Sequence, residues 1–145
     1  MRRAKPPARR PARPARFGPP DHPGALLARW VAASEWLSRA ACGDADPGWF
    51  FVESTKGDPE SLASKRLLAG MELCATCEVR RECLDSAIEM ESDGVWGGST
   101  EHDRARVSHL PRAEAVAELE RTLPERLELR RASQLRARRA AKTRK

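Results

Sequence analysis

The sequence has few of the residues that build a large apolar core. Its 145 residues include three Phe, four Trp and no Tyr, so aromatic residues make up 5% of the chain. A chain of this length is expected to form one domain, and a core this thin is marginal without a metal or disulfides. No apolar run is long enough to span a membrane and no signal peptide is recognisable, which predicts a cytoplasmic protein.

Acidic residues are missing from both ends of the chain. Residues 1–20 contain seven Arg or Lys and residues 130–145 contain eight, whereas all 21 Asp and Glu lie between these ends. The proline-rich stretch 1–24 is predicted to be a disordered arm. Basic ends of this kind are typical either of solvated tails or of arms that bind a polyanion, most plausibly nucleic acid.

The alternating runs of β-branched and aromatic residues that mark strands are also missing. Apolar residues instead recur at helical spacing, so the sequence predicts a small all-α domain. Asp58 and Pro59 are expected to begin a helix and Gly70 to loosen the chain after it, while Pro124 is expected to interrupt a helix. The expected helices cover residues 25–39, 58–69, 77–91, 100–110, 112–122 and 125–141.

Cysteine is scarce as well, with four in the chain, and three of them lie close together. Cys74, Cys77 and Cys83 are spaced C-x2-C and C-x5-C, and Cys42 lies upstream. In a reducing compartment such residues are more often metal ligands than disulfides, and thiolates favour zinc, iron–sulfur clusters or copper(I). Zinc sites usually draw their ligands as two close pairs, whereas here Cys42 stands alone and Cys83 follows at C-x5-C. An iron–sulfur cluster is larger than one ion and is also held by four cysteines. The spacing therefore favours an iron–sulfur cluster over zinc.

Two other functions are compatible with these cysteines. Cys74 and Cys77 could be the redox pair of a thiol–disulfide oxidoreductase, although such pairs usually occur in a βαβ context and no strands are predicted here. The four cysteines could also hold zinc in a nucleic-acid adaptor.

A glycine-rich turn, Gly94-Val95-Trp96-Gly97-Gly98, follows the last cysteine. Its three glycines can adopt backbone conformations with positive φ. The simplest interpretation is a connection between helices with Trp96 in the core. The alternative is a rigid turn that presents Val95 and Trp96 to a partner, because Trp is a favoured anchor of protein interfaces.

The order Cys…Cys-x2-Cys-x5-Cys, followed by Gly-Val-Trp-Gly-Gly, resembles the WhiB-like family of actinobacteria and their phages. The resemblance covers about Ala41 to Arg106, including the Phe50-Phe51 pair and Arg104. It implies a small all-helical cytoplasmic domain, over residues 25–110, wrapped around one [4Fe–4S] cluster. The implied ligands are Cys42, Cys74, Cys77 and Cys83.

The same resemblance implies a transcriptional regulator rather than an enzyme, with a cluster that responds to redox state or nitric oxide and with disulfides in the apo form. The implied partner is the C-terminal region of the primary sigma factor of RNA polymerase, and the protein is expected to be a monomer apart from that complex. The turn residues expected to contact sigma are Gly94, Val95, Trp96, Gly97 and Gly98.

The basic C-terminal tail is the expected DNA-binding segment, within a helical extension over residues 111–145. Acids are absent from it, and neutralising phosphates releases counterions without requiring a base-specific contact. The residues expected to bind DNA are Arg136, Arg138, Arg139, Lys142, Arg144 and Lys145.

Overall fold

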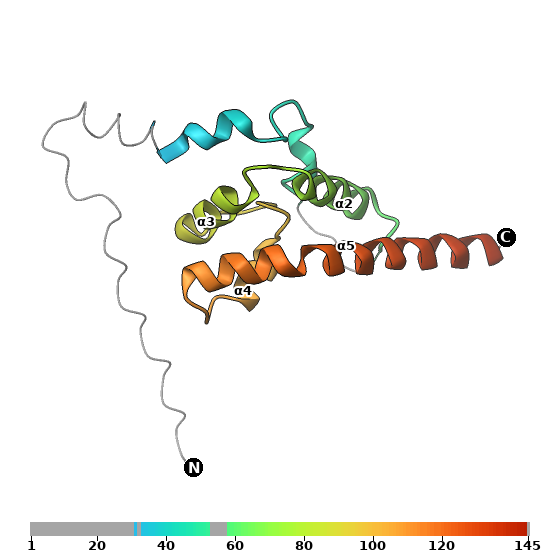
Figure 1. The fold of residues 1–145 in the computed structure, drawn as a ribbon. Coiled ribbons are helices and arrows are strands. Elements are labelled where there is room, and N and C mark those ends of the chain that lie inside the picture. The colour runs from blue at the N-terminus through green and yellow to red at the C-terminus, as the bar shows by residue number, and fades with distance from the viewer. Residues whose placement is uncertain (1–30, 32, 53–57, 145) are drawn as a thin grey trace, which may run out of the picture. The chain divides into compact units, whose positions relative to one another are not determined.

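The computed structural model describes residues 31, 33–52 and 58–144, so the arm predicted over residues 1–24 lies outside the described residues. The chain divides into two compact units, Met1–Glu35 and Trp36–Lys145, and the second holds almost all described residues. From Glu35 onward, the described elements are two 3-10 helices and four α-helices: η1 (Glu35–Arg39), η2 (Pro47–Trp49), α2 (Leu62–Ala75), α3 (Arg80–Met90), α4 (Glu101–Arg106) and α5 (Arg112–Thr143) (Figure 1).

The all-α class predicted from the sequence is confirmed. In the part of the chain that the structure describes, the one β pairing is an isolated bridge between Trp96 and Ser99. None of the described helices combines the length and the apolar character that a membrane crossing requires.

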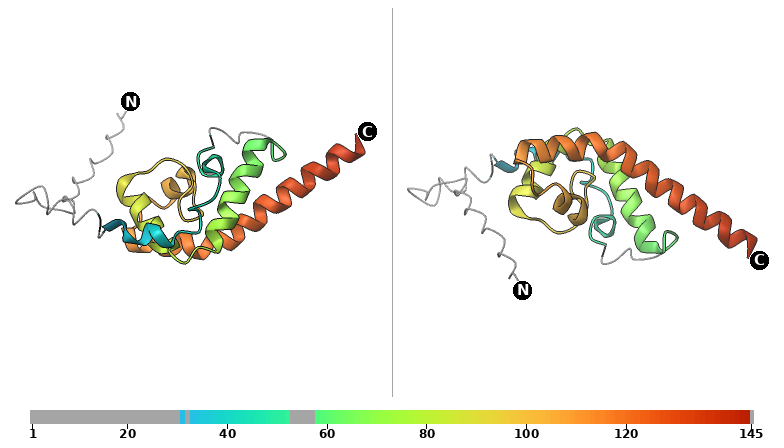
Figure 2. Two further views of the ribbon diagram at one scale, coloured as in Figure 1. Left: turned by 90° about the horizontal axis from the view of Figure 1, so that it is seen from above. Right: turned by 90° about the horizontal axis from the view of Figure 1, so that it is seen from below.

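The longest element, α5, holds the second unit together because α2, α3 and α4 all pack against it. One apolar cluster joins Leu123 and Leu127 of α5 to the buried face of α2 and to Phe50. A second cluster joins the first turns of α5 to Leu84 of α3 and to Val107. Figure 2 shows α2 and α5 side by side from two opposite directions.

The prediction that Pro124 ends a helix is wrong, because α5 runs through it without a break. Proline removes one backbone donor and costs about 3 kcal/mol in a helix interior. Leu123 and Leu127 lie one turn apart on either side of Pro124 and are 1% and 4% exposed. Burying both against α2 requires a continuous helix, and that burial offsets the missing hydrogen bond.

The predicted start and end of α2 are also wrong. Ser61 rather than Asp58 is the N-cap, since its hydroxyl accepts a hydrogen bond from the Ser64 N–H at 3.1 Å, while Asp58 caps the preceding turn. The helix then continues through Gly70 to Ala75. A Cβ at Gly70 would lie 2.7 Å from the Trp49 carbonyl oxygen. Glycine here therefore allows close packing of α2 against η2, and it does not loosen the chain.

The remaining helices differ from the predictions mainly at their ends. The third predicted helix starts at Arg80 rather than Cys77, and Val79, Leu84 and Ala87 are buried as expected. The helix predicted over 100–110 is shorter, because α4 ends at Arg106. The helix predicted over 25–39 continues as η1 from Glu35, and its residues 25–30 lie outside the described part.

Leu123 provides a test of how much α5 contributes to the core. Leu123→Ala is expected to lower the free energy of unfolding by about 2–5 kcal/mol, because truncating a buried Leu loses apolar contacts and leaves a cavity. Leu129→Ala is the matched control on the same helix, since Leu129 is 61% exposed and its change should stay within about 0.5 kcal/mol. Urea unfolding followed by circular dichroism measures both, and equal effects would contradict the central position of Leu123.

Candidate metal centre

The four cysteines come from three segments of the second unit and line one cavity of about 290 Å³. Cys42 lies between η1 and η2, Cys74 in the last turn of α2, Cys77 in the connection to α3, and Cys83 in the first turns of α3. Cys74 is buried and Cys42 is exposed, and all four are free thiols. The structure therefore brings together the residues that the sequence singled out as ligands.

The cavity walls are almost entirely apolar. They include Trp36, Phe50, Val95 and Trp96, and Arg80 is the one formally charged residue among the described residues that line it. The volume is roughly ten times the ~30 Å³ that one water molecule occupies in the liquid. In the described ranges, no three His, Cys, Asp or Glu side chains are grouped closely enough to hold a single metal ion.

The glycine turn brings backbone N–H groups close to two of the cysteines. The N–H of Gly97 lies near Cys83 and that of Gly98 lies near Cys74, and each lowers the pKa of its thiol. Both glycines have positive φ, 55° and 75°, and the flanking Trp96 and Ser99 pair through two backbone hydrogen bonds of 3.0 and 2.9 Å. A turn with two successive positive φ values points consecutive N–H groups outward, and such concavities bind anions, including iron–sulfur centres.

The structure leaves no room for a side chain at Gly97 or Gly98. A Cβ at Gly97 would lie 2.5 Å from Cγ of Leu84, and one at Gly98 would lie 2.8 Å from the methyl groups of Leu123. Both neighbours are core residues that cannot move away. The two glycines are therefore required by their close packing as well as by their backbone conformation.

Burial raises the pKa of Cys74 to about 11 and that of Cys83 to about 12, from 9.0. Neighbouring thiols add to the effect on each residue, while the nearby backbone N–H groups of Gly98 and Gly97 oppose it. The thiols of Cys74 and Cys83 are thus protonated at neutral pH. A metal that binds them as thiolates must displace those protons, which couples metal binding to pH.

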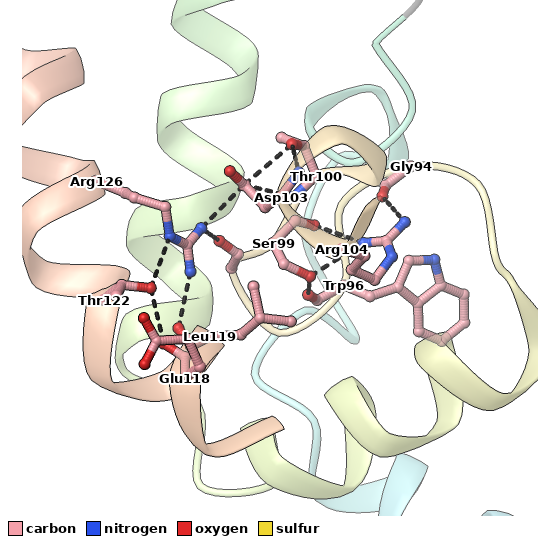
Figure 3. Close-up of polar contacts among 11 residues, drawn as sticks. Gly94, Trp96, Ser99, Thr100, Asp103, Arg104, Glu118, Leu119, Thr122 and Arg126 are labelled. Carbon is pink, nitrogen blue, oxygen red and sulfur yellow. Dashed lines mark hydrogen bonds and ion pairs between the residues drawn. The ribbon is translucent and has the colours of Figure 1, made fainter. Parts of the chain in front are cut away.

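The carbonyl side of the turn is held by Arg104 of α4 (Figure 3). Its guanidinium donates to the carbonyls of Ser92, Gly94 and Ser99 at 2.6, 2.9 and 2.8 Å, and to the Ser99 hydroxyl at 3.0 Å. Arg104 is 8% exposed, and burial lowers the pKa of its guanidinium, an effect that Glu101 and Asp103 oppose. Its role is to fix the turn from behind.

A second arginine, Arg126 of α5, was missed by the sequence reasoning. Its guanidinium donates to the Gly98 carbonyl at 2.6 Å and pairs with Asp103 at 3.0 Å (Figure 3). Asp103 also forms a capping box with Thr100 at the start of α4. Nothing in the sequence marks Arg126, which follows Gly98 by 28 residues, because α5 brings it to the turn only when the helices pack.

The residues predicted to contact sigma are not equally accessible. Val95 is 7% exposed and belongs to the core cluster, and Gly97 and Gly98 are buried. Trp96 is partly buried, lines the cysteine cavity and donates its indole N–H to the Asp93 carbonyl at 2.7 Å. Two exposed apolar residues, Leu37 and Phe51, line the same cavity and are 50% and 61% exposed.

The predicted DNA-binding residues lie in or just beyond the last turns of α5, and Lys145 is outside the described residues. The helix divides them between two faces. Arg138 pairs with Glu60 at 3.0 Å, just as Arg131 pairs with Glu72 at 2.8 Å, so this face packs along α2. Arg136 and Arg139 are exposed, and helical spacing places them on the opposite face.

A family described as "Transcription factor WhiB" matches residues 36–107, which include all four cysteines and the glycine turn and stop short of α5. Transcriptional regulator WhiB2 of Mycobacterium tuberculosis is 40% identical over 77 residues, or 52% of this chain and 76% of the relative. Transcriptional regulator WhiB of Streptomyces coelicolor is 41% identical over 73 residues, 50% of this chain and 74% of its own length.

Transcriptional regulator WhiD of Streptomyces coelicolor is 36% identical over 84 residues, covering 57% of this chain and 73% of the relative. No solved structure gives a significant match. The family match contains the whole cysteine cavity, and the relatives are covered over about three quarters of their length. The chain therefore belongs to the WhiB family.

Proposed function

We propose that the protein is a transcriptional regulator that holds a [4Fe–4S] cluster through Cys42, Cys74, Cys77 and Cys83. The observation that carries this proposal is the shared apolar cavity that all four cysteines line, with the backbone N–H groups of Gly97 and Gly98 close to Cys83 and Cys74. Membership of the WhiB family, whose relatives are named as transcriptional regulators, supports the regulatory role.

The residues present fit such a cluster. Four thiolates are the usual ligands of an iron–sulfur cluster, and hydrogen bonds to sulfur together with exclusion of water are the levers by which proteins tune it. Cavity volume and donor chemistry both suit a group larger than a single ion. When bound, the cluster would supply an iron–sulfur centre that responds to redox state and to nitric oxide.

The chain's own contribution is to hold three segments around one point. The connection between η1 and η2, the end of α2 and the start of α3 each bring at least one cysteine to the cavity. Loss of the cluster would release these segments, and the freed thiols could then form disulfides in the presence of an oxidant. A change in the cluster would in this way alter the surface presented to partners.

The raised thiol pKa values argue against the alternative of a dithiol oxidoreductase. A nucleophilic cysteine needs a lowered pKa and access to substrate. Cys74, the first cysteine of that pair, is buried and its pKa is raised to about 11, so it has the opposite properties.

Substitution of the cysteines tests the cluster directly. Replacing any one of Cys42, Cys74, Cys77 or Cys83 by Ser should remove most of the bound iron, the visible absorption from thiolate-to-iron charge transfer and part of the helicity, since metal binding also contributes folding energy. Ala75→Ser is the matched control, because it introduces the same side chain at an exposed position between Cys74 and Cys77. Full iron content in a cysteine variant, measured on anaerobically purified protein, would exclude that cysteine as a ligand.

We place the contact with the primary sigma factor at the rim of the cavity, centred on Trp96. The buried Val95, Gly97 and Gly98 then support the contact from below, and Leu37 and Phe51 supply exposed apolar surface beside it. This arrangement suits an interface in which a few large apolar anchors carry most of the binding energy.

Trp96→Ala should weaken sigma binding by roughly 30- to 1,000-fold, because truncating an interface Trp costs about 2–4 kcal/mol. Trp96→Phe, which keeps the apolar bulk, should bind more tightly than the Ala variant. Iron per protein and sigma pull-down are measured on the same anaerobic sample. Loss of iron before loss of binding would show that Trp96 is a lid over the cavity rather than an anchor.

We further propose that DNA phosphates are bound by the exposed face of the C-terminal half of α5. Arg136 and Arg139 face away from α2, whereas Arg138 is already paired with Glu60. The family match ends at residue 107, so membership of the family does not by itself cover this segment. Such contacts would be salt-dependent and weakly sequence-selective.

The double variant Arg136→Gln with Arg139→Gln should weaken binding to all DNA sequences alike, and the slope of log affinity against log salt should fall by about one unit per lost phosphate contact. Arg81→Gln with Arg121→Gln is the control, because it removes the same charge from exposed arginines elsewhere. Fluorescence anisotropy over a salt series measures both. An unchanged slope in the first variant would remove this face from DNA binding.

A further inference from the structure

Arg80 is the first residue of α3 and reaches into the wall of the cysteine cavity. Its Nη1 donates to the Ala75 carbonyl at 3.1 Å, which links the end of α2 to the start of α3. This bond holds the guanidinium in place without using its other donors. Arg80 thus brings a fixed positive charge to a cavity that is otherwise apolar apart from the thiols.

The Nε of Arg80 is buried and has no hydrogen-bond partner, and among the described residues it is the one buried side-chain nitrogen or oxygen in that state. Leaving a buried donor of a charged group unpaired is costly, and such atoms are rare in native structures. Because Arg80 lines the cavity, this N–H is a candidate donor to an acceptor bound there.

Two other arginines near the turn show the contrast. Arg104 uses its guanidinium on three carbonyls and a hydroxyl, and Arg126 uses its own on two carbonyls, the Thr122 hydroxyl and Asp103. Both are engaged by groups of the protein itself. Arg80 differs because it lines the cavity and keeps a buried donor unused.

We propose that Arg80 is a positioning and tuning residue of the metal centre, whose Nε–H donates to a sulfur of the bound cluster or of its cysteine ligands and whose charge offsets the negative charge of the centre. This inference rests on the proposed function. Four thiolates outweigh the positive charge of an iron–sulfide core, so a cationic donor inside the apolar wall is favourable there.

The positive charge of Arg80 favours the more negative, reduced form of a bound cluster. Removing it should make one-electron reduction harder and move the midpoint potential to more negative values.

Three variants distinguish the effect of the Arg80 charge from that of its hydrogen bond, and from the effect of removing a positive charge outside the cavity. Arg80→Gln removes the charge, Arg80→Lys keeps the charge but loses the fixed guanidinium donor, and Arg81→Gln removes a charge from the exposed neighbour on the same helix. The anaerobically loaded proteins are titrated with dithionite and mediators, and the reduced fraction is read by electron paramagnetic resonance. Iron loss in the presence of a chelator is followed by visible absorption.

In Arg80→Gln, the ratio of reduced to oxidised cluster at a fixed potential should fall about tenfold, which equals a shift of about 59 mV for a one-electron couple. Chelator-driven iron loss should become several-fold faster. Arg80→Lys should lie between this variant and the unmodified protein, and Arg81→Gln should match the unmodified protein. A cluster-free Arg80→Gln whose apo form keeps the normal circular dichroism spectrum would also support the proposal.

Unchanged potential and iron retention in Arg80→Gln would overturn the proposal while leaving the cluster itself established. Loss of helicity in the apo forms of both Arg80 variants would also overturn it, and would assign Arg80 to joining α2 and α3 through Ala75. If Arg80→Gln alone is misfolded, the potential of Arg80→Lys decides, and a value equal to that of the unmodified protein counts against the inference. Absence of iron from the unmodified protein would instead contradict the proposed function.

Discussion

The proposed metal centre depends on one short turn, in which the backbone N–H groups face the cysteines and the carbonyl groups face the other way. Gly97 and Gly98 direct their N–H groups to two cysteine sulfurs, while Arg104 and Arg126 bind the carbonyls on the other side. Buried backbone groups must be paired, so each side of the turn requires its own partners. The cavity, α4 and α5 are arranged so that both requirements are met at once.

This requirement explains why α5 is more than an appended tail. The match to the WhiB family ends at residue 107, yet Leu123 and Arg126 of α5 pack against the turn and bond to it. The first half of α5 completes the core, and its second half carries the basic face proposed for DNA. One continuous helix therefore connects the proposed metal centre with that face, and a break at Pro124 would separate them.

Local sequence signals predicted elements well and their ends poorly. Helical periodicity indicated the inner face of α3, including Val79, Leu84 and Ala87, because periodicity reports which side of a helix is buried. Pro124 and Gly70 misled because their intrinsic preferences are worth at most a few kcal/mol. Burial of the surrounding side chains against neighbouring helices is of comparable size, and it decided both positions.

The sequence by itself determined the all-α class, the WhiB-like motif and the choice of the four cysteines as candidate ligands, since spacing along the chain is sufficient to recognise all three. The tertiary structure alone decided that Val95 supports the core, that Arg126 holds the turn, and that Arg80 keeps a buried donor in the cavity wall. These roles depend on which residues distant in sequence become neighbours and on which polar groups remain unpaired. Both are set by the packing of α2, α3 and α5, which the order of residues does not display.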